Sequence, residues 1–369
     1  MRVLITGGAG FIGSHTSDLL LERGYEVRIL DNLQHRVHPR GKPSYVPKDA
    51  EFVLGDVRRR KDLEKALKGV DYVFHLAAYQ DYMLDFSTFF HVNTVSTALL
   101  FELIVMNRFS VRKIVLASSQ AVYGEGKYQC EKHGVIYPSS RPLEQLKRGQ
   151  WELKCPKCGE EIKPLKIDET RVNPHTAYGV SKYASEMAAY NLGRKYEIPA
   201  VNLRYSIVQG PRNSFYNAYS GICRIFTLRL LRDLAPVVYE DGRQLRDYVY
   251  IGDVARANLL VMEKDEANYQ TFNVGGRKGT TVLEFAKILA DKCGKNIEPG
   301  IPGEFRFGDT RHTVSDSSKL QSLGWEPTTP LERIVEEYVE WVKTQPEIKD
   351  YYSEAEKIMK RMGIVQTST

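Results

Sequence analysis

Three side chains in this sequence have the types and the spacing to move a proton and a hydride. Tyr178 and Lys182 lie four residues apart in a stretch whose pattern predicts a helix, so they share one face. The lysine charge favours the phenolate and lowers the pKa of Tyr178, which would give a usable base near neutral pH. Ser119 follows an apolar run that predicts a strand, and its hydroxyl could bond the same substrate hydroxyl. We expect all three to be catalytic; taken alone, the Tyr–Lys pair would be an ordinary pair on a helix surface.

A glycine-rich turn supplies a site for the hydride acceptor. The segment GGAGFIG, residues 7–13, follows the first predicted strand and opens the first predicted helix. Gly7, Gly10 and Gly13 let the backbone turn sharply and approach a pyrophosphate, which the helix N-terminus then binds. Asp31 follows the second predicted strand, and its carboxylate would accept a ribose 2′-hydroxyl and repel a 2′-phosphate. We therefore expect NAD rather than NADP; the alternative is a structural turn beside a capping aspartate.

Two short Cys/His pairs predict a metal site. Cys130 and His133 form one pair, and Cys155 and Cys158 form the other, within a segment that has few apolar residues of its own. Four such ligands suit tetrahedral Zn²⁺, and the metal would supply folding energy that the segment lacks. Because all four positions are taken, the zinc is expected to be structural. The alternative is a set of free surface thiols without a metal.

The residues that could do chemistry can meet only if strands and helices alternate around one sheet. Apolar runs at 2–6, 26–30, 51–54, 72–76, 113–117 and 200–205 predict strands, with further strand-like pieces at 237–239 and 271–274. Periodic stretches at 12–23, 61–68, 94–107, 177–196 and 331–343 predict helices. This alternation predicts the α/β class, as a Rossmann-type doubly wound parallel sheet with a smaller C-terminal substrate lobe.

The segment between Ser119 and Tyr178 interrupts this alternation, which predicts four parts of the chain. The dinucleotide-binding domain takes residues 1–124 and 168–205, and the inserted zinc-knuckle segment takes 125–167. Residues 206–345 form mainly the substrate-binding lobe, and 346–369 form a C-terminal tail that either packs as a helix or frays. Because the insertion separates two residues that must meet, we expect it to loop out near the mouth of the active site. There it would cover the substrate or shape a contact between subunits.

The composition limits the classes of partner. The 369 residues carry a net charge of +6, with Lys and Arg mixed among Asp and Glu rather than gathered in a basic stripe. This favours an anionic small molecule over nucleic acid. No run of 18 apolar residues predicts a membrane span, and no charged leader precedes the first strand, so we expect a cytoplasmic protein. Three of the five cysteines fall in the inserted segment, which favours a metal site over disulfides.

Six motifs in this order resemble those of the extended short-chain dehydrogenases that include the NAD-dependent nucleotide-sugar epimerases and dehydratases. The resemblance covers about residues 1–124 and 168–340. The motifs are TGGAGFIG (6–13), GDV (55–57), HLAA (75–78), SSQAVYG (118–124), YGVSK (178–182) and RDYVYIGDV (246–254). The inserted zinc segment resembles the dTDP-L-rhamnose 4-epimerase branch more than the UDP-galactose branch. Members of the family usually form dimers through two helices, which here correspond to 94–107 and 177–196.

The resemblance implies roles for individual residues. Asp56 and Val57 would flank the adenine, Asn93 would brace the site, and Tyr205 would lie beside the nicotinamide. The residues implied in cofactor binding are Gly7, Gly10, Phe11, Ile12, Gly13, Asp31, Asn32, Asp56, Val57, Leu76, Ala77, Ala78, Asn93, Tyr178, Lys182 and Tyr205. Those implied in substrate binding are Gln120, Arg246 and Arg306, the two arginines as ligands of the substrate diphosphate.

Gln120 and Ala121 discriminate between the reactions of this family. In the 4,6-dehydratases an Asp–Glu pair stands at these positions and supplies acid and base, which Gln and Ala cannot do. The remaining reaction is 4-epimerisation of a nucleoside-diphosphate sugar, of the dTDP-L-rhamnose or UDP-glucose/galactose type. The alternatives are an oxidoreductase or decarboxylase acting on such a sugar and, more remotely, a non-catalytic cofactor-binding or nucleic-acid-binding protein. Ile207 and Phe307 replace typical family residues on the substrate side, which predicts an atypical sugar or nucleotide.

Overall fold

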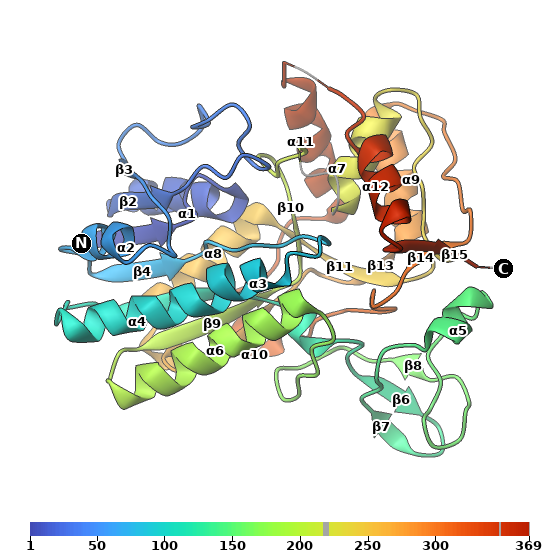
Figure 1. Ribbon diagram of the computed structural model, residues 1–369, viewed down its shortest axis with the longest axis horizontal. Coiled ribbons are helices and arrows are strands. Elements are labelled where there is room, and N and C mark those ends of the chain that lie inside the picture. The colour runs from blue at the N-terminus through green and yellow to red at the C-terminus, as the bar shows by residue number, and fades with distance from the viewer. Residues whose placement is uncertain (217–220, 347, 369) are drawn as a thin grey trace.

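A computed structural model describes residues 1–216, 221–346 and 348–368 (Figure 1). Its centre is a seven-stranded sheet in the order β12-β9-β5-β4-β1-β2-β3, in which every pairing is parallel. Its strands are β1 (Arg2–Thr6), β2 (Glu26–Asp31), β3 (Glu51–Leu54), β4 (Tyr72–His75), β5 (Lys113–Ser119), β9 (Ala200–Tyr205) and β12 (Thr271–Val274). The predicted doubly wound parallel sheet is therefore confirmed. The chain order reverses at β1 and β4, and such a switch point opens a crevice at the carboxyl ends of the strands.

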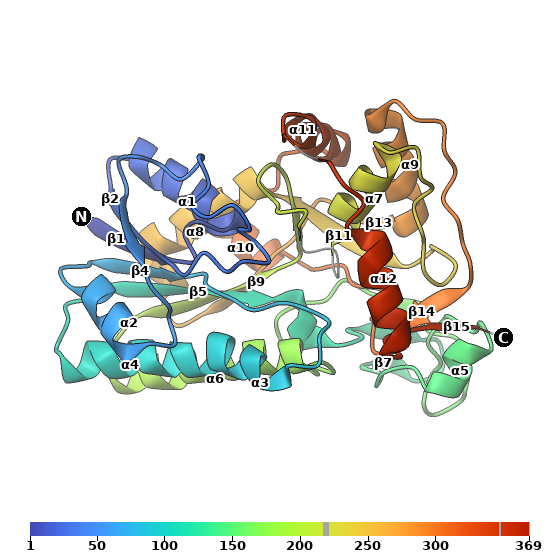
Figure 2. The same cartoon turned by 45° about the horizontal axis from the view of Figure 1, so that its top comes forward.

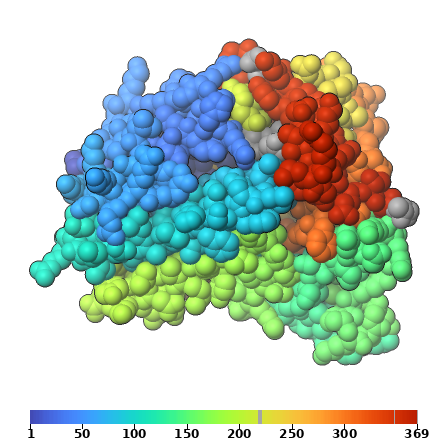
Figure 3. Space-filling view, viewed as in Figure 1, coloured from blue at the N-terminus to red at the C-terminus, as the bar shows by residue number. Residues whose placement is uncertain are grey.

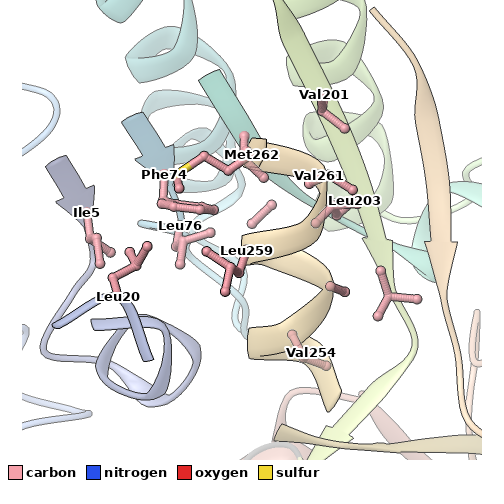
Figure 4. Close-up of a cluster of buried hydrophobic side chains, with 14 of the residues drawn as sticks. Ile5, Leu20, Phe74, Leu76, Val201, Leu203, Val254, Leu259, Val261 and Met262 are labelled. Carbon is pink, nitrogen blue, oxygen red and sulfur yellow. The ribbon is translucent and has the colours of Figure 1, made fainter. Parts of the chain in front are cut away.

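Helices cover both faces of the sheet, because its strands are apolar on both sides. The helices α1 (Phe11–Glu22) and α8 (Ile251–Glu263) cover one face, and α2 (Arg60–Leu67), α4 (Ser96–Met106) and α6 (Ala177–Lys195) cover the other (Figure 2). Successive side chains of a strand point to opposite faces, so Ile5 packs below α1 and α8 while Leu4 packs toward α2 and α4. Figure 4 shows Ile5 with Leu20 of α1 and Leu259 of α8 in the first of these cores.

The helix predicted from residue 94 begins earlier than expected. It runs through α3 (Phe86–Phe89) and a π-helical turn (Phe90–Val95) into α4. The span Phe86–Met106 is the one helix in the described part of the chain that is long and apolar enough to cross a membrane. It packs along α6, and 44% of its most apolar window is buried inside the protein. A π-helical turn contains about one residue more than an α-helical turn, and such turns are often found at functional sites. The extra residue shifts the helical period, so a pattern with a period of 3.6 residues does not show where this helix begins.

The C-terminal part of the chain builds a second, smaller layer beside the sheet. It contains the short sheet β10 (Ile207–Gln209), β11 (Leu245–Tyr250) and β13 (Gly279–Thr281), and the helices α7 (Ile222–Leu230), α9 (Val282–Cys293) and α11 (Leu331–Lys343). The short helix α10 (Ser318–Gln321) instead packs against β12 of the central sheet. The strand predicted at 237–239 is wrong, since only an isolated bridge joins Val237 to Gly300 there. The tail forms α12 (Tyr352–Arg361) and β15 (Val365–Thr367), which pairs with β14 (Glu304–Arg306). Buried Tyr352 and Met359 hold it against this lobe.

The inserted segment folds as a small separate unit. Its sheet joins β6 (Tyr128–Cys130) to β7 (Gly134–Ile136) and β8 (Lys163–Pro164), and α5 (Leu143–Lys147) lies beside it. Figure 3 shows the segment (green) projecting at the lower right, next to the orange and red C-terminal segments. It therefore leaves the central sheet and contacts the C-terminal lobe.

Candidate active site

The glycine turn after β1 has the close backbone contacts that require glycine. Gly7 has φ +70°, and a Cβ there would lie 2.8 Å from the backbone N of Ala77. A Cβ on Gly13 would lie 2.3 Å from the carbonyl oxygen of Gly7. Gly10 caps α1 at its N-terminus without a side chain. The turn, the start of α1 and the end of β4 thus form a backbone surface that a pyrophosphate can approach closely.

Two carboxylates lie beside this turn, since Asp31 ends β2 and Asp56 follows β3. Asp31 is buried, and its two oxygens accept one hydrogen bond each, from Ala9 N (3.0 Å) and Leu33 N (2.8 Å). A carboxylate has further acceptor sites, so Asp31 retains capacity for ribose hydroxyls. Asn32 donates its side-chain amide to Asp56 at 3.1 Å. Although burial opposes ionisation, hydrogen bonds from Arg58 and Asn32 lower the pKa of Asp56 to about 2.

The other residues predicted to hold the cofactor surround the same crevice. Phe11 and Ile12 line a large cavity at the carboxyl ends of the strands. Val57 and Leu76 are buried, Ala77 is half-buried, and Ala78 is exposed. The structure thus brings the cofactor candidates together along one edge of the sheet, from β3 to β9.

The cavity has a volume of about 730 Å³ and lies between the sheet edge and the C-terminal lobe. Its walls include Ser119 from the end of β5 and Tyr178 from the first turn of α6. Arg246 and Arg306 line it from the lobe. The structure therefore brings Ser119 and Tyr178 together with the predicted substrate-binding side chains in one cavity, which Lys182 does not line.

Local structure fixes Tyr178 opposite Ser119. Thr176 caps α6, and its hydroxyl accepts the backbone N–H of Gly179 at 3.0 Å, which sets the helix start. A Cβ on Gly179 would lie 2.5 Å from the carbonyl oxygen of Ala121, so glycine lets α6 approach the loop after β5. A hydrogen bond with Ser119 lowers the pKa of Tyr178, but burial has the larger effect and raises it.

The predicted effect of Lys182 on the pKa of Tyr178 stays a prediction, because burial raises that pKa and a hydrogen bond with Ser119 opposes the rise. Lys182 is 3% exposed, and its ammonium donates a hydrogen bond to the carbonyl oxygen of Ala117 at 2.8 Å. Burial lowers the pKa of Lys182 itself to about 8, against the opposing charge of Glu186. The lysine is therefore held beneath the site by the backbone of β5, and the net effect on Tyr178 is that of burial.

Asn93 braces the site from the π-helical turn. Its side-chain carbonyl accepts the backbone N–H of Tyr79 at 2.9 Å, and its amide donates to Tyr79 O and to Ser181 Oγ. The buried amide thus ties the loop after β4 to the helix that carries Tyr178 and Lys182. The resemblance implied a bracing role for Asn93, and these hydrogen bonds support that prediction.

Tyr205 and Gln120 complete the wall beside Ser119. Ser119 and Tyr205 are register partners at the ends of β5 and β9. The Tyr205 hydroxyl donates to Asn258 Oδ1 at 2.7 Å, which holds the ring at the cavity edge. Among the described residues, the buried side-chain oxygen of Gln120 has no hydrogen-bond partner, although Gln120 lines the cavity. Such an acceptor is available to a ligand hydroxyl.

The two predicted substrate arginines differ in their surroundings. Arg246 donates to the carbonyl oxygens of Leu245, Thr310 and Arg311, each at 2.9 Å. Arg306 is buried, with its guanidinium 4.4 Å from the ring centroid of Tyr82, and its Nε has no partner among the described residues. A buried cation with an unpaired donor at a cavity wall fits an anionic ligand.

Several cavity residues were not predicted from the sequence. Tyr82, whose hydroxyl donates to Asp309 at 3.3 Å, and His175, three residues before Tyr178, both line the cavity. Arg224 of α7 lines it as well. The aromatic-rich run around Tyr82 was the available signal, but its pattern fits no regular element.

The four predicted metal ligands lie together. The Sγ of Cys130 is 3.8 Å from that of Cys158, and Nδ1 of His133 is 3.5 Å from the Sγ of both Cys130 and Cys155. All four ligand atoms lie within 4.8 Å of one another. A tetrahedron with Zn–S of about 2.3 Å and Zn–N of about 2.0 Å has edges of about 3.8 Å and about 3.5 Å. The measured separations therefore fit the donor set of a zinc site.

The surroundings of the cluster also suit a metal. The small core of the insertion consists of Tyr128, Ile136, Leu153, Ile162 and the cysteines themselves. Although burial opposes ionisation, backbone N–H groups of Lys157 and Cys158 lower the pKa of the Cys155 thiol to about 6. A thiolate is the ligand form of cysteine, so the turn is prepared for a cation.

His75, at the end of β4, predicts a loss of stability in mild acid. Its ring nitrogens bond Thr6 and Ser96 at 2.9 Å, and burial with the charge of Lys182 lowers its pKa from 6.5 to about 3. Between these two pH values His75 is protonated in the unfolded chain but neutral in the folded chain. The free energy of unfolding therefore decreases as the pH falls. From pH 7 to pH 5 the loss is about 2 kcal/mol. Urea unfolding at both pH values should show a smaller pH effect in His75→Gln; an equal effect would contradict this assignment.

Comparisons with known proteins agree with this geometry. Residues 3–143 and 155–275 match the family described as the NAD dependent epimerase/dehydratase family. The dTDP-L-rhamnose 4-epimerase of Burkholderia thailandensis is 34% identical over 95% of this chain and 97% of that protein. The UDP-glucose 4-epimerase of Thermotoga maritima, solved with UDP-glucose, is 32% identical with a TM-score of 0.77 over 94% of this chain and all of that one. The UDP-glucose 4-epimerase of Thermus thermophilus, solved with NAD, is 31% identical with a TM-score of 0.74 over 93% of this chain and 99% of that one.

The family match spans most of the chain, and its gap falls inside the inserted segment. The glycine turn, the Ser119–Tyr178–Lys182 group and the relatives all indicate the same cofactor and the same type of site. The chain belongs to the NAD-dependent epimerase/dehydratase family, within the nucleotide-sugar epimerases of the extended short-chain dehydrogenases.

Proposed function

We propose that this protein is an NAD-dependent nucleoside-diphosphate-sugar 4-epimerase. The observation that carries the proposal is the shared cavity, which is lined by Ser119, by Tyr178 and by the start of α1 after the glycine turn. Gln120 and Ala121 occupy the positions at which an elimination reaction would need an acid and a base. Bound NAD would accept the hydride from C4 of the sugar and return it to the opposite face. The residues of the chain then have to bind, orient and exchange one proton.

Each of these tasks has a candidate side chain. Tyr178 removes the proton of the C4 hydroxyl and later returns it, while Ser119 holds the same oxygen by a hydrogen bond. Lys182 donates to the Ala117 carbonyl and stays beneath the site, and Asn93 keeps α6 in register with the loop after β4. The sugar has to turn over between the two hydride transfers, for which the cavity of about 730 Å³ offers room.

We infer that the substrate is of the dTDP-L-rhamnose or UDP-glucose type. Two relatives act on such sugars by their names, and Arg306 and Arg246 lie where a diphosphate would need cations. The test is incubation of the purified protein with UDP-, dTDP-, GDP- and CDP-sugars, followed by NMR of the products. A C4 epimer formed without added NAD and without NADH supports the proposal. Net formation of NADH, or of a decarboxylated sugar, would replace it by the oxidoreductase or decarboxylase alternative.

We also propose a structural zinc ion at Cys130, His133, Cys155 and Cys158. The ligand distances and the small core around them support it. With four protein ligands no position remains for a substrate, so the ion would hold the insertion together. Thiols that bind zinc must stay reduced, which favours a cytoplasmic location.

We further propose that the protein is a homodimer. Apolar side chains on neighbouring helices α4 and α6 are exposed in the single chain, among them Met106, Val180, Met187 and Tyr190. Apolar patches of this kind favour a partner surface. A second copy covering α4 and α6 would also account for the apolar character of Phe86–Met106. Light scattering of the purified protein would distinguish a dimer from a monomer.

A further inference from the structure

Two adjacent residues of the insertion contact opposite walls of the active-site cavity. Ser140 Oγ lies 2.7 Å from Nδ1 of His175, which lines the cavity on the side of the catalytic helix. Arg141 contacts the other wall, where it donates to the carbonyl oxygen of Asp309 at 2.8 Å. The side chains of two consecutive residues therefore link the two walls of the cavity.

Both terminal nitrogens of Arg141 are engaged at this crossing, while its Nε lies 3.6 Å from Glu125 Oε1. Arg141 is 3% exposed, and its two terminal nitrogens bind both carboxylate oxygens of Glu240 at 2.9 and 2.8 Å. One of them also donates to Trp151 O within the insertion at 2.9 Å. Glu240 and Asp309 both line the cavity from the C-terminal lobe. The guanidinium thus joins the insertion to the lobe by directed, charge-assisted bonds, which fix geometry more strictly than apolar packing.

A second buried arginine extends the same contact. Arg311 has 0% exposure and binds Glu152 of the insertion together with Glu240 and Asp241 of the lobe. Its backbone N–H donates to Glu125 Oε2 at 2.8 Å. The insertion therefore binds residues 309–311 at both ends, through Arg141 at Asp309 and through Glu125 and Glu152 at Arg311. The carbonyl oxygens of Thr310 and Arg311 in turn accept hydrogen bonds from Arg246.

Buried charge networks of this kind add little net stability, because desolvation of the charges offsets their attraction. The ion pair Lys163–Glu131, on the outer side of the same insertion, is exposed and joins nothing to the cavity. The arrangement around Arg141 is consequently better explained by the position that it imposes on the cavity wall than by stability alone.

We infer that Ser140 and Arg141 are positioning residues which fix the two cavity walls relative to each other, so that the insertion sets the affinity for the nucleotide-sugar substrate. The inference rests on the proposed function for the identity of the ligand. It assigns no part in proton or hydride transfer to the insertion. A change at Arg141 should therefore weaken substrate binding. The same change should leave the chemical step and the retention of NAD unaffected.

Steady-state kinetics of Arg141→Met, Arg141→Lys, Ser140→Ala and the control Lys163→Met test this. For Arg141→Met we expect KM to rise about tenfold or more with kcat nearly unchanged and bound NAD retained. Arg141→Lys keeps the charge but not the fork geometry, so its KM should be intermediate; Ser140→Ala should give a smaller rise, and Lys163→Met none. Equal KM values in all variants, or a loss of kcat at constant KM, would overturn the inference.

Two further measurements do not depend on turnover. Calorimetric titration with UDP and with dTDP should show weaker binding to Arg141→Met and Ser140→Ala than to Lys163→Met. Amide hydrogen exchange over residues 308–313 should be faster in the Arg141 variants, while exchange in β1 and β5 stays the same. If the parent protein epimerises no sugar, the proposed function fails, yet exchange at 308–313 still decides whether the insertion positions this wall. Should Arg141→Met fail to fold, Ser140→Ala and Arg141→Lys carry the same comparison.

Discussion

Replacement of Tyr178 by Phe should lower kcat for 4-epimerisation by about 10³-fold, since a general acid–base group contributes about 10²- to 10⁴-fold. The change removes one hydroxyl and leaves the ring that packs near Phe89 and lines the cavity. Its two partners in the catalytic group cannot replace the base: Ser119 is a poor base, and Lys182 is engaged by Ala117 O at 2.8 Å. KM should change little, because the lost hydroxyl serves the transfer of the proton more than binding.

The measurement is the rate of C4 inversion by NMR, with the NAD content of each preparation determined after denaturation. Tyr196→Phe is the matched control, because Tyr196 directly follows the same helix and its side chain is exposed. It should keep the parent rate and the parent NAD content. Turnover of Tyr178→Phe at the parent rate would remove the phenol from the mechanism. Loss of NAD from this variant would instead indicate a structural role.

Burial changes the pKa of both members of the Tyr178–Lys182 pair. Burial raises the pKa of Tyr178, and burial also lowers the pKa of Lys182 to about 8. The spacing of Tyr178 and Lys182 on one helix was readable from the sequence, but the balance between burial and charge depends on atoms from β5 and α6 together.

The parts of the fold that were predictable are those with a local physical signal. Short apolar runs indicated the central strands, and the glycines of 7–13 with Asp31 located the cofactor turn, because each needs a particular residue type at a particular place. The Cys and His pairs were readable for the same reason: ligand chemistry restricts the residue types, and the tight turns restrict the spacing.

The features that were missed depend on contacts between distant segments. The π-helical turn at Phe90–Val95 breaks the helical period, and its reason is the placement of Asn93 against Ser181. The sequence left open whether the tail packs as a helix or frays; the tail forms α12, and its strand β15, which was not predicted, pairs with β14. Arg141 and Arg311 carried no signal in the sequence, since only the docking of the insertion onto the lobe buries them. No periodic pattern records such a contact.

Removal of the thiols at positions 155 and 158 should have the second large effect, which begins in the insertion. Zinc binding by four such ligands is worth about 10–16 kcal/mol, so each thiolate accounts for roughly 3 kcal/mol, or about 100-fold in affinity. Cys155→Ser/Cys158→Ser should therefore lower zinc affinity by about 10⁴-fold, and the purified variant should lack the ion that we expect in the parent protein. The small core around Tyr128 and Ile162 has too little apolar surface to stay ordered without it.

Metal analysis by mass spectrometry, with hydrogen exchange over 125–167, measures both consequences. Cys293→Ala is the control, because Cys293 is a buried thiol of the C-terminal lobe whose pKa is raised to about 11, far from thiolate character. An unchanged zinc content in the double variant would refute the ligand assignment. The sheet and the glycine turn have their own cores, so NAD should stay bound, whereas Ser140, Arg141 and Glu152 should lose their hold on the cavity wall. Zinc loss should then resemble Arg141→Met in its rise of KM, because both release the same wall by different routes.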